Sequence, residues 1–258
     1  MAGTFDLILV RHGETDSNRT KLIQVSLGLK KRKHFFITIK FISESLLQGH
    51  RDTPLSTVGE EQVVQVAKEL ANTRLDLVVS SDLQRALRTG EAIVAANASV
   101  SSLETWQEAR ERCFGEFEGQ PAEMLITASA KAKEVGRLKE WGPKGGETGE
   151  QFRARVKSVL MKLCKVLPLN VDSLKPTVLA TTHGGFIKEF NCMIVEEFNC
   201  EMPGKKGEYQ RICPNTGISR YTIELDQAGS LSSIQCTMLH SKDHLGNLEG
   251  PEPVLYGV

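Results

Sequence analysis

The segment Phe5-Asp-Leu-Ile-Leu-Val-Arg-His-Gly-Glu-Thr15 decides the fold, because a short apolar run stops there at a string of polar residues. A continuous apolar run of this length, bounded by polar residues, is typical of a strand buried on both faces of a parallel sheet. We therefore expect a strand over Phe5–Val10 that ends beside a functional loop.

The same pattern occurs twice more along the chain. Leu75–Ser80 is an apolar run that ends at Ser81-Asp82, and Thr177–Thr181 is another that ends at Thr182-His183-Gly184-Gly185. Strand-like runs that alternate with helical patterns indicate an α/β protein with a mainly parallel central sheet. Ligands of such sheets bind beyond the carboxyl ends of the strands, so the site is expected where these three runs stop.

Helices and a terminal hairpin are expected between and after the strands. Thr57–Glu60 can form a capping box, followed by apolar residues at helical spacing over Val63–Ala71. A second apolar stripe covers Phe152–Leu167. Gly217–Leu225 alternates as a strand does and is expected to pair with Ile234–Leu239.

The overall composition excludes several classes of protein. The 258 residues carry 32 Lys and Arg against 32 Asp and Glu, so the formal net charge predicts neither nucleic acid nor an anionic membrane as a partner. No apolar run reaches the roughly 20 residues of a membrane-spanning helix. Six cysteines without a C-x-x-C pair, and no signal-peptide pattern, predict a reduced cytoplasmic protein, with nucleus and mitochondria left open.

The residues at the expected strand ends suit cleavage of a phosphate monoester. A neutral imidazole can accept a phosphoryl group and pass it to water, and His12 is the candidate nucleophile. The transferred group carries negative charge, for which Arg11, Arg85 and His183 are the available donors. The leaving oxygen needs a proton, and Glu111 is the candidate acid.

Each of these residues also has a structural interpretation. A single histidine at a strand end is usually a hydrogen-bonded structural residue, and Glu111 taken alone is an exposed partner of the neighbouring arginines. The basic cluster Lys30–His34 can be either a nuclear-localisation patch or an exposed charged surface. The combination of R-H-G-E-T, S-S-D-L-Q-R and T-H-G-G after three separate strands favours catalysis.

The motifs together resemble the histidine phosphatase superfamily, also called phosphoglycerate-mutase-like. Six blocks occur in the family order over about 200 residues. They are R-H-G-E-T-x-x-N (Arg11–Asn18), Q-G-x-x-D-x-P-L-S (Gln48–Ser56), S-S-D-L-x-R (Ser80–Arg85), R-E-R-x-x-G-x-x-E-G (Arg110–Gly119), G-G-E-T (Gly145–Thr148) and T-H-G (Thr182–Gly184).

The resemblance implies a three-layer α/β/α fold, no cofactor, no metal and a phosphohistidine intermediate. By position, His12 becomes the phosphate acceptor and Glu111 the proton donor. The resemblance implies a phosphate pocket formed by Arg11, Asn18, Arg85, His183 and the Gly184 amide. It places Gln48 and Gly49 on the substrate side.

The substrates known for this family are small phosphate esters, including fructose 2,6-bisphosphate and 2,3-bisphosphoglycerate. Pro214–Ser219 and Lys242–Leu245 look most like the fructose-2,6-bisphosphatase branch, which restrains glycolysis. Two alternatives remain open: a phosphoglycerate mutase or 2,3-bisphosphoglycerate phosphatase with the same site, and a catalytically weak isoform that acts by binding protein partners.

The sequence departs from the family pattern in two places. Gly185 stands where the family usually has alanine. Gly49 lies 31 positions after Asn18, whereas relatives place it much closer, so we expect one domain over residues 1–258 with an atypical insert at 25–48. Because the codons at both ends can form splice sites, we interpret the insert as an intron read in frame; a genuine regulatory loop or nuclear signal is the alternative.

Overall fold

A single six-stranded sheet forms the centre of the molecule. The computed structural model describes residues 3–18, 46–166 and 175–248. The strand order is β3-β2-β4-β1-β5-β6, in which β1, β2, β3 and β4 run parallel while β5 is antiparallel to β1 and to β6. The strands are β1 (Gly3–Arg11), β2 (Leu77–Ser80), β3 (Glu104–Thr105), β4 (Thr177–Thr182), β5 (Ile218–Leu225) and β6 (Leu231–Ser241).

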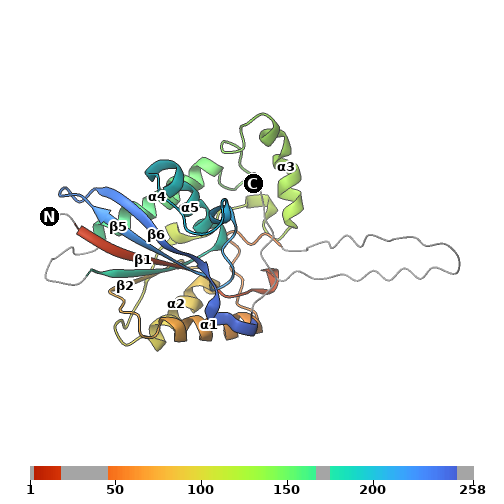
Figure 1. Cartoon of the computed structure of the whole chain (residues 1–258). Coiled ribbons are helices and arrows are strands. Elements are labelled where there is room, and N and C mark those ends of the chain that lie inside the picture. The colour runs from red at the N-terminus through yellow and green to blue at the C-terminus, as the bar shows by residue number, and fades with distance from the viewer. Residues whose placement is uncertain (1–2, 19–45, 167–174, 249–258) are drawn as a thin grey trace, which may run out of the picture.

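Helices cover both faces of this sheet. Figure 1 shows α1 and α2 on one face and α4 and α5 on the other, with α3 standing apart from the sheet. The predicted α/β class, mainly parallel sheet and three layers are therefore confirmed. The helices are α1 (Thr57–Leu70), α2 (Gln84–Ala96), α3 (Ala122–Glu134), α4 (Gly149–Val166) and α5 (Gly184–Phe198).

Strand β1 is buried on both faces, as its continuous apolar run predicts. Its alternate side chains point to opposite layers. Phe5, Leu7 and Leu9 belong to the apolar core that includes residues of α4 and α5, whereas Ile8 and Val10 pack with residues of α1 and α2. Burial of such a side chain stabilises the fold by about 1.5–3 kcal/mol, so β1 anchors both layers.

The start of α1 differs from the predicted capping box. Ser56 is the N-cap, with an extended backbone and a side-chain oxygen that accepts a hydrogen bond from the Gly59 amide at 3.0 Å. Thr57 is already helical, so the predicted Thr57–Glu60 box is wrong by one residue. Ser56 also donates to Glu14 at 2.9 Å, which ties the helix start to the loop after β1.

The other predicted elements are found close to their expected bounds. Helix α4 carries the predicted stripe from Phe152 to Leu163, while Leu167 lies outside the described residues, and β5 pairs with β6 as predicted. Of the predicted insert, residues 25–45 lie outside the described residues. Its last three residues belong to the folded domain, because Leu46 bridges to Pro121 and Leu47 packs with Ala122 and Leu125.

Candidate active site

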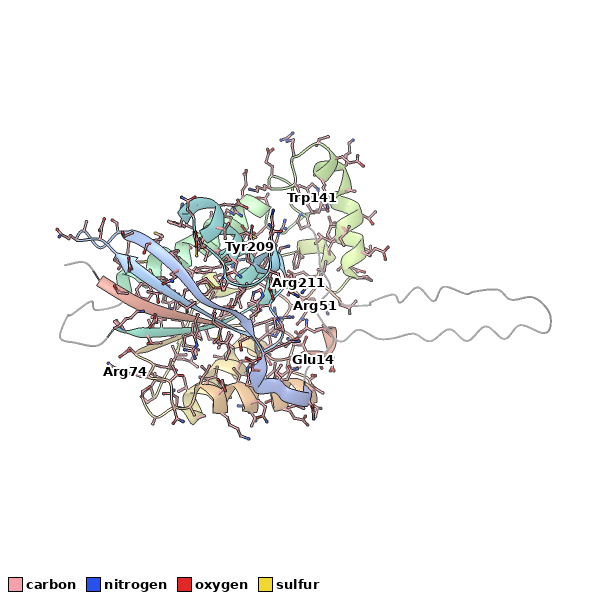
Figure 2. All side chains as sticks on the ribbon, in the orientation of Figure 1. Glu14, Arg51, Arg74, Trp141, Tyr209 and Arg211 are labelled. Atoms are coloured by element: carbon pink, nitrogen blue, oxygen red, sulfur yellow. The ribbon has the colours of Figure 1, made fainter. Side chains whose placement is uncertain are left out.

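The carboxyl ends of three strands bring the predicted site residues to one edge of the sheet. In the parallel register Arg11 of β1 lies opposite Thr182 of β4, and Ser80 of β2 lies opposite Thr181. The residues that follow these strands therefore meet. Figure 2 shows Glu14 and Arg51 at this end of the sheet, whereas Arg74 lies toward the other end.

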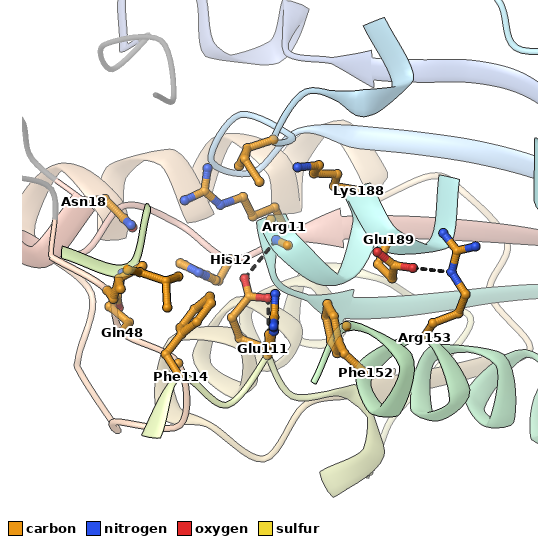
Figure 3. A pocket seen from close by; sticks show the side chains of 18 of the residues that line it. Arg11, His12, Asn18, Gln48, Glu111, Phe114, Phe152, Arg153, Lys188 and Glu189 are labelled. Carbon is orange, nitrogen blue, oxygen red and sulfur yellow. Dashed lines mark hydrogen bonds and ion pairs between the residues drawn. The ribbon is translucent and has the colours of Figure 1, made fainter. Parts of the chain in front are cut away.

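A pocket of about 500 Å³ opens at this edge. Eight of the nine predicted site residues line it, namely Arg11, His12, Asn18, Gln48, Gly49, Arg85, Glu111 and Gly184. Figure 3 shows His12 and Glu111 facing each other across its inner part. The ninth, His183, lies behind His12, with the two ring centroids 5.2 Å apart in an edge-to-face arrangement.

His12 is held in one tautomer by the backbone. Its Nδ1 lies 2.7 Å from the Gly13 carbonyl oxygen, which can only accept, so Nδ1 carries the hydrogen and Nε2 keeps its lone pair. Burial, and next the charges of Arg85 and Arg11, hold the pKa of His12 well below its ordinary value. His12 is thus a neutral imidazole at neutral pH, the form that a nucleophile requires.

His183 is completely buried between His12 and the second strand end. Its Nε2 lies 2.9 Å from the hydroxyl of Ser81, and its Nδ1 is buried with no hydrogen-bond partner among the described residues. Burial, followed by the charge of Arg85, holds the pKa of His183 well below its ordinary value. The Ser81 contact was not foreseen, although the S-S-D-L-Q-R motif contains this serine.

Arg85 lies at the start of α2 and lines the pocket. It is the second residue of α2. Its two terminal nitrogens donate to the carbonyls of Gly49 and Arg51, each at 2.8 Å. A guanidinium has five N–H donors, so three remain for a ligand in the pocket that Arg85 lines. Burial lowers the pKa of Arg85 to about 10, which leaves it charged at neutral pH.

The carboxylate of Glu111 is fixed by two backbone amides. Its Oε1 accepts from the amide of Arg112 at 2.9 Å and its Oε2 from the amide of Gly185 at 2.8 Å. A Cβ at Gly185 would collide with this carboxylate. The glycine at this position leaves room for the start of α5 to lie against the Glu111 carboxylate.

Asn18, Gln48 and Gly49 also line the pocket. Asn18 ends a short 3₁₀ helix, η1 (Asp16–Asn18), directly after the β1 loop. Gln48 is buried and accepts a hydrogen bond from the Thr53 hydroxyl. Gly49 has a positive φ of 52°, a conformation that favours glycine, and its carbonyl faces Arg85.

The outer end of the pocket carries charged residues that the sequence reasoning missed. Arg153 of α4 forms an ion pair with Glu189 of α5 at 2.5 Å, and Lys139 and Lys188 line the same region. Figure 3 shows Arg153, Glu189 and Lys188 away from His12. No motif marks these residues, because each lies in a helical or loop pattern that reads as ordinary surface.

Two features are absent from the described part of the chain. No group of three or more His, Cys, Asp or Glu side chains there is arranged to hold a metal ion. None of the helices there is long and apolar enough to cross a membrane.

Comparison with known proteins relates this site to a family. A family model described as "Histidine phosphatase superfamily (branch 1)" matches residues 41–233. The chain belongs to the histidine phosphatase superfamily. The match begins after Arg11–Asn18, but similarity to curated members of the superfamily extends over nearly the full length. The predicted resemblance is confirmed, and the protein is a phosphatase of this superfamily.

Two relatives and one solved structure illustrate the similarity. The chain is 30% identical to fructose-2,6-bisphosphatase TIGAR B of Danio rerio, over 96% of this chain and 99% of the relative. It is 28% identical to fructose-2,6-bisphosphatase TIGAR of Xenopus tropicalis, over 95% and 96%. A mycobacterial glucosyl-3-phosphoglycerate phosphatase has the same fold, with a TM-score of 0.67 at 20% identity, over 93% of this chain and 100% of that one.

Proposed function

We propose that this histidine phosphatase hydrolyses fructose 2,6-bisphosphate to fructose 6-phosphate and inorganic phosphate, and thereby lowers glycolytic flux. One observation carries the chemistry. The His12 imidazole is neutral, has its lone pair on Nε2, and lies in a pocket that Arg11 and Arg85 also line. A nucleophile and the cations that stabilise a transferred phosphoryl group are thus in one place.

The reaction has two steps. Nε2 of His12 attacks phosphorus, the bond from phosphorus to the sugar oxygen breaks, and Glu111 as carboxylic acid gives its proton to that oxygen. A water molecule then attacks the phosphohistidine, its proton passes to the Glu111 carboxylate, and the nitrogen–phosphorus bond breaks to release phosphate. The two backbone amides that hold Glu111 keep one carboxyl group in place for both transfers.

The substrate is proposed from the relatives and from the charged residues that line the pocket. The curated relatives named above are fructose-2,6-bisphosphatases. The outer pocket provides Lys139, Arg153 and Lys188 at a distance from His12, which suits a small ester with a second anionic group. The proposed setting is the cytoplasm, and the proposed working unit is one phosphatase domain.

The decisive test is phosphate release from fructose 2,6-bisphosphate with a chelator present. The full chain is compared with a chain that lacks Val25–Gln48, in which Leu22-Ile23-Gln24 takes the place of Leu46-Leu47-Gln48 before Gly49. Release by both supports the proposal with a tolerated insert, and release by the shortened chain alone shows that the insert disables the site. If neither releases phosphate, the proposed substrate is wrong.

Product analysis separates the proposal from its alternatives. Phosphate accumulation from fructose 2,6-bisphosphate supports it, whereas isomerised phosphoglycerate with little free phosphate indicates a mutase. A folded chain that forms no phosphohistidine with any of these esters favours the isoform that acts by binding partners.

A further inference from the structure

The turn before β5 contacts Arg11, the last residue of β1, and the backbone of His12, which follows it. The Cys213 carbonyl accepts from the Arg11 guanidinium at 2.7 Å, and the Gly217 carbonyl accepts from the Arg11 amide at 3.2 Å. The Thr216 amide donates to the His12 carbonyl at 3.3 Å. A segment some 200 residues later in the chain therefore fixes the nucleophile's backbone.

One side chain of this turn reaches two residues of the active site. The Nδ2 group of Asn215 donates to the His12 carbonyl at 3.1 Å and to the Oδ1 atom of Asn18 at 3.4 Å. Oδ1 of Asn18 also accepts from the amide of Thr15 at 3.2 Å and from its hydroxyl at 3.1 Å.

Backbone groups fix the orientation of both amide side chains. The His12 carbonyl can only accept, so the Asn215 atom beside it is the NH₂ group. The Thr15 N–H can only donate, so the Asn18 atom beside it is the oxygen. With three donors on its oxygen, Asn18 turns its own NH₂ group away from this network.

We propose that Asn215 is a positioning residue that holds the Asn18 amide with its NH₂ group toward the phosphoryl group beside His12. Asn18 lines the pocket together with His12, and the ionised oxygens of a phosphoryl group accept hydrogen bonds but do not donate them. A reversed amide would present its oxygen to those oxygens and repel them. Asn215 therefore acts through Asn18 and does not itself touch the reacting atoms.

The inference rests on the proposed function, but inorganic phosphate tests it without any sugar substrate. Calorimetric titration of phosphate into the full chain is compared for the wild type, Asn215→Ala and Asn215→Asp. Loss of one hydrogen bond should weaken phosphate binding roughly three- to tenfold in the alanine variant. The aspartate variant keeps the shape but places acceptors against two oxygens, so a larger loss is expected.

A matched control separates positioning from general damage to the turn. His244 contacts the same turn through the Thr216 hydroxyl at 3.1 Å. The variant His244→Gln should therefore keep phosphate affinity within about twofold of the wild type. Circular dichroism and thermal unfolding show whether each variant folds. If Asn215→Ala or Asn215→Asp fails to fold, Asn215→Ser takes its place.

A double-mutant cycle shows whether Asn215 acts through Asn18. In an Asn18→Ala background, Asn215→Ala should cause little further loss of phosphate affinity. Equal losses in both backgrounds, or unchanged affinity in folded Asn215 variants, would overturn the inference and leave the proposed function standing. A wild type that binds phosphate but does not hydrolyse fructose 2,6-bisphosphate refutes only the substrate, and one that binds no phosphate refutes both proposals.

Discussion

The two ends of the active-site pocket are built in different ways. At the inner end, backbone groups hold the functional side chains: the Gly13 carbonyl fixes His12, and two amides fix Glu111. At the outer end, side chains hold one another, as in the pairs of Arg153 with Glu189 and Glu196. Backbone groups cannot move without the fold, whereas paired surface side chains can exchange partners.

This difference separates chemistry from selectivity. His12 is only 3% exposed, and the side chains of the Arg153–Glu189 pair are 18% and 22% exposed. Arg153 and Glu189 lie away from His12, so substitutions there change the charge of the pocket and leave the reacting groups in place. We therefore expect substitutions at the inner end to slow the chemical steps themselves, and those at the outer end to change which ester is preferred.

The largest effect is expected for His12→Ala. Without the imidazole no phosphohistidine can form, so phosphate release should fall by more than about 10³-fold for every ester tested. Stopped assays with fructose 2,6-bisphosphate and p-nitrophenyl phosphate measure it. His240→Asn, at a half-buried histidine that does not line the pocket, is the control. Substantial residual turnover by His12→Ala would show that another group is the nucleophile.

A smaller and more selective loss is expected for Glu111→Gln. An amide cannot donate a proton to the leaving oxygen, so turnover of sugar phosphates should fall by about 10²- to 10⁴-fold. The good leaving group of p-nitrophenyl phosphate needs little protonation and should be affected much less. Equal losses for both substrates in rate measurements would exclude Glu111 as the acid.

At the outer end, Arg153→Ala should act mainly on KM. Loss of one partly exposed cation is expected to raise the KM for fructose 2,6-bisphosphate about two- to fivefold. The KM for p-nitrophenyl phosphate, which has no second anionic group, should change less. Steady-state kinetics with both substrates measure this ratio. A large fall in kcat for both would mean that the outer end also positions the reacting groups.

Protonation should weaken the fold at mildly acidic pH. The pKa values of His12 and His183 are depressed in the folded state, chiefly by burial. Below the ordinary histidine pKa of 6.5, these residues therefore bind more protons in the unfolded chain than in the folded protein. Each histidine contributes its full stabilisation above pH 6.5. As the pH falls below 6.5, each one lowers the free energy of unfolding by about 1.4 kcal/mol per pH unit.

Urea unfolding at several pH values measures this slope. The variant His183→Gln is the matched comparison, because it removes one of the two buried imidazoles and should give a shallower slope. A free energy of unfolding that stays constant below pH 6.5 would contradict the burial of neutral imidazoles.

The sequence predicted the elements whose patterns are long and the residues that stand in motifs. Strand β1 and helix α4 were foreseen because burial imposes a continuous or periodic apolar pattern on them. Strand β3, with only two residues, and helix α3, with few buried side chains, carry no such pattern and were not predicted. The start of α1 was misplaced because Ser56 and Thr57 are both good caps, and only tertiary contact with Glu14 distinguishes them.

The sequence predicted which residues form the site but not the contacts between them. The alternation of strands and helices predicts a parallel sheet, whose strand ends bring His12 and His183 to one edge, whereas Glu111 was proposed from its motif. Spacing cannot show that Arg85 holds the carbonyls of Gly49 and Arg51, or that Asn215 reaches Asn18. Those contacts depend on how loops that are distant in the sequence pack against each other, and no pattern in a single sequence indicates that packing.

The position of β1 in the sheet has a consequence for biosynthesis. Of the strands in this sheet β1 is made first, but its two neighbours are β4 and β5, with Asp6 opposite both Thr177 and Thr222. While the ribosome is still adding the middle of the chain, this apolar strand has neither partner and must be shielded by chaperones or by transient contacts. Catalysis can therefore begin only after β4 and β5 have emerged, and termination before them yields products in which the strand that carries the nucleophile lacks its partners.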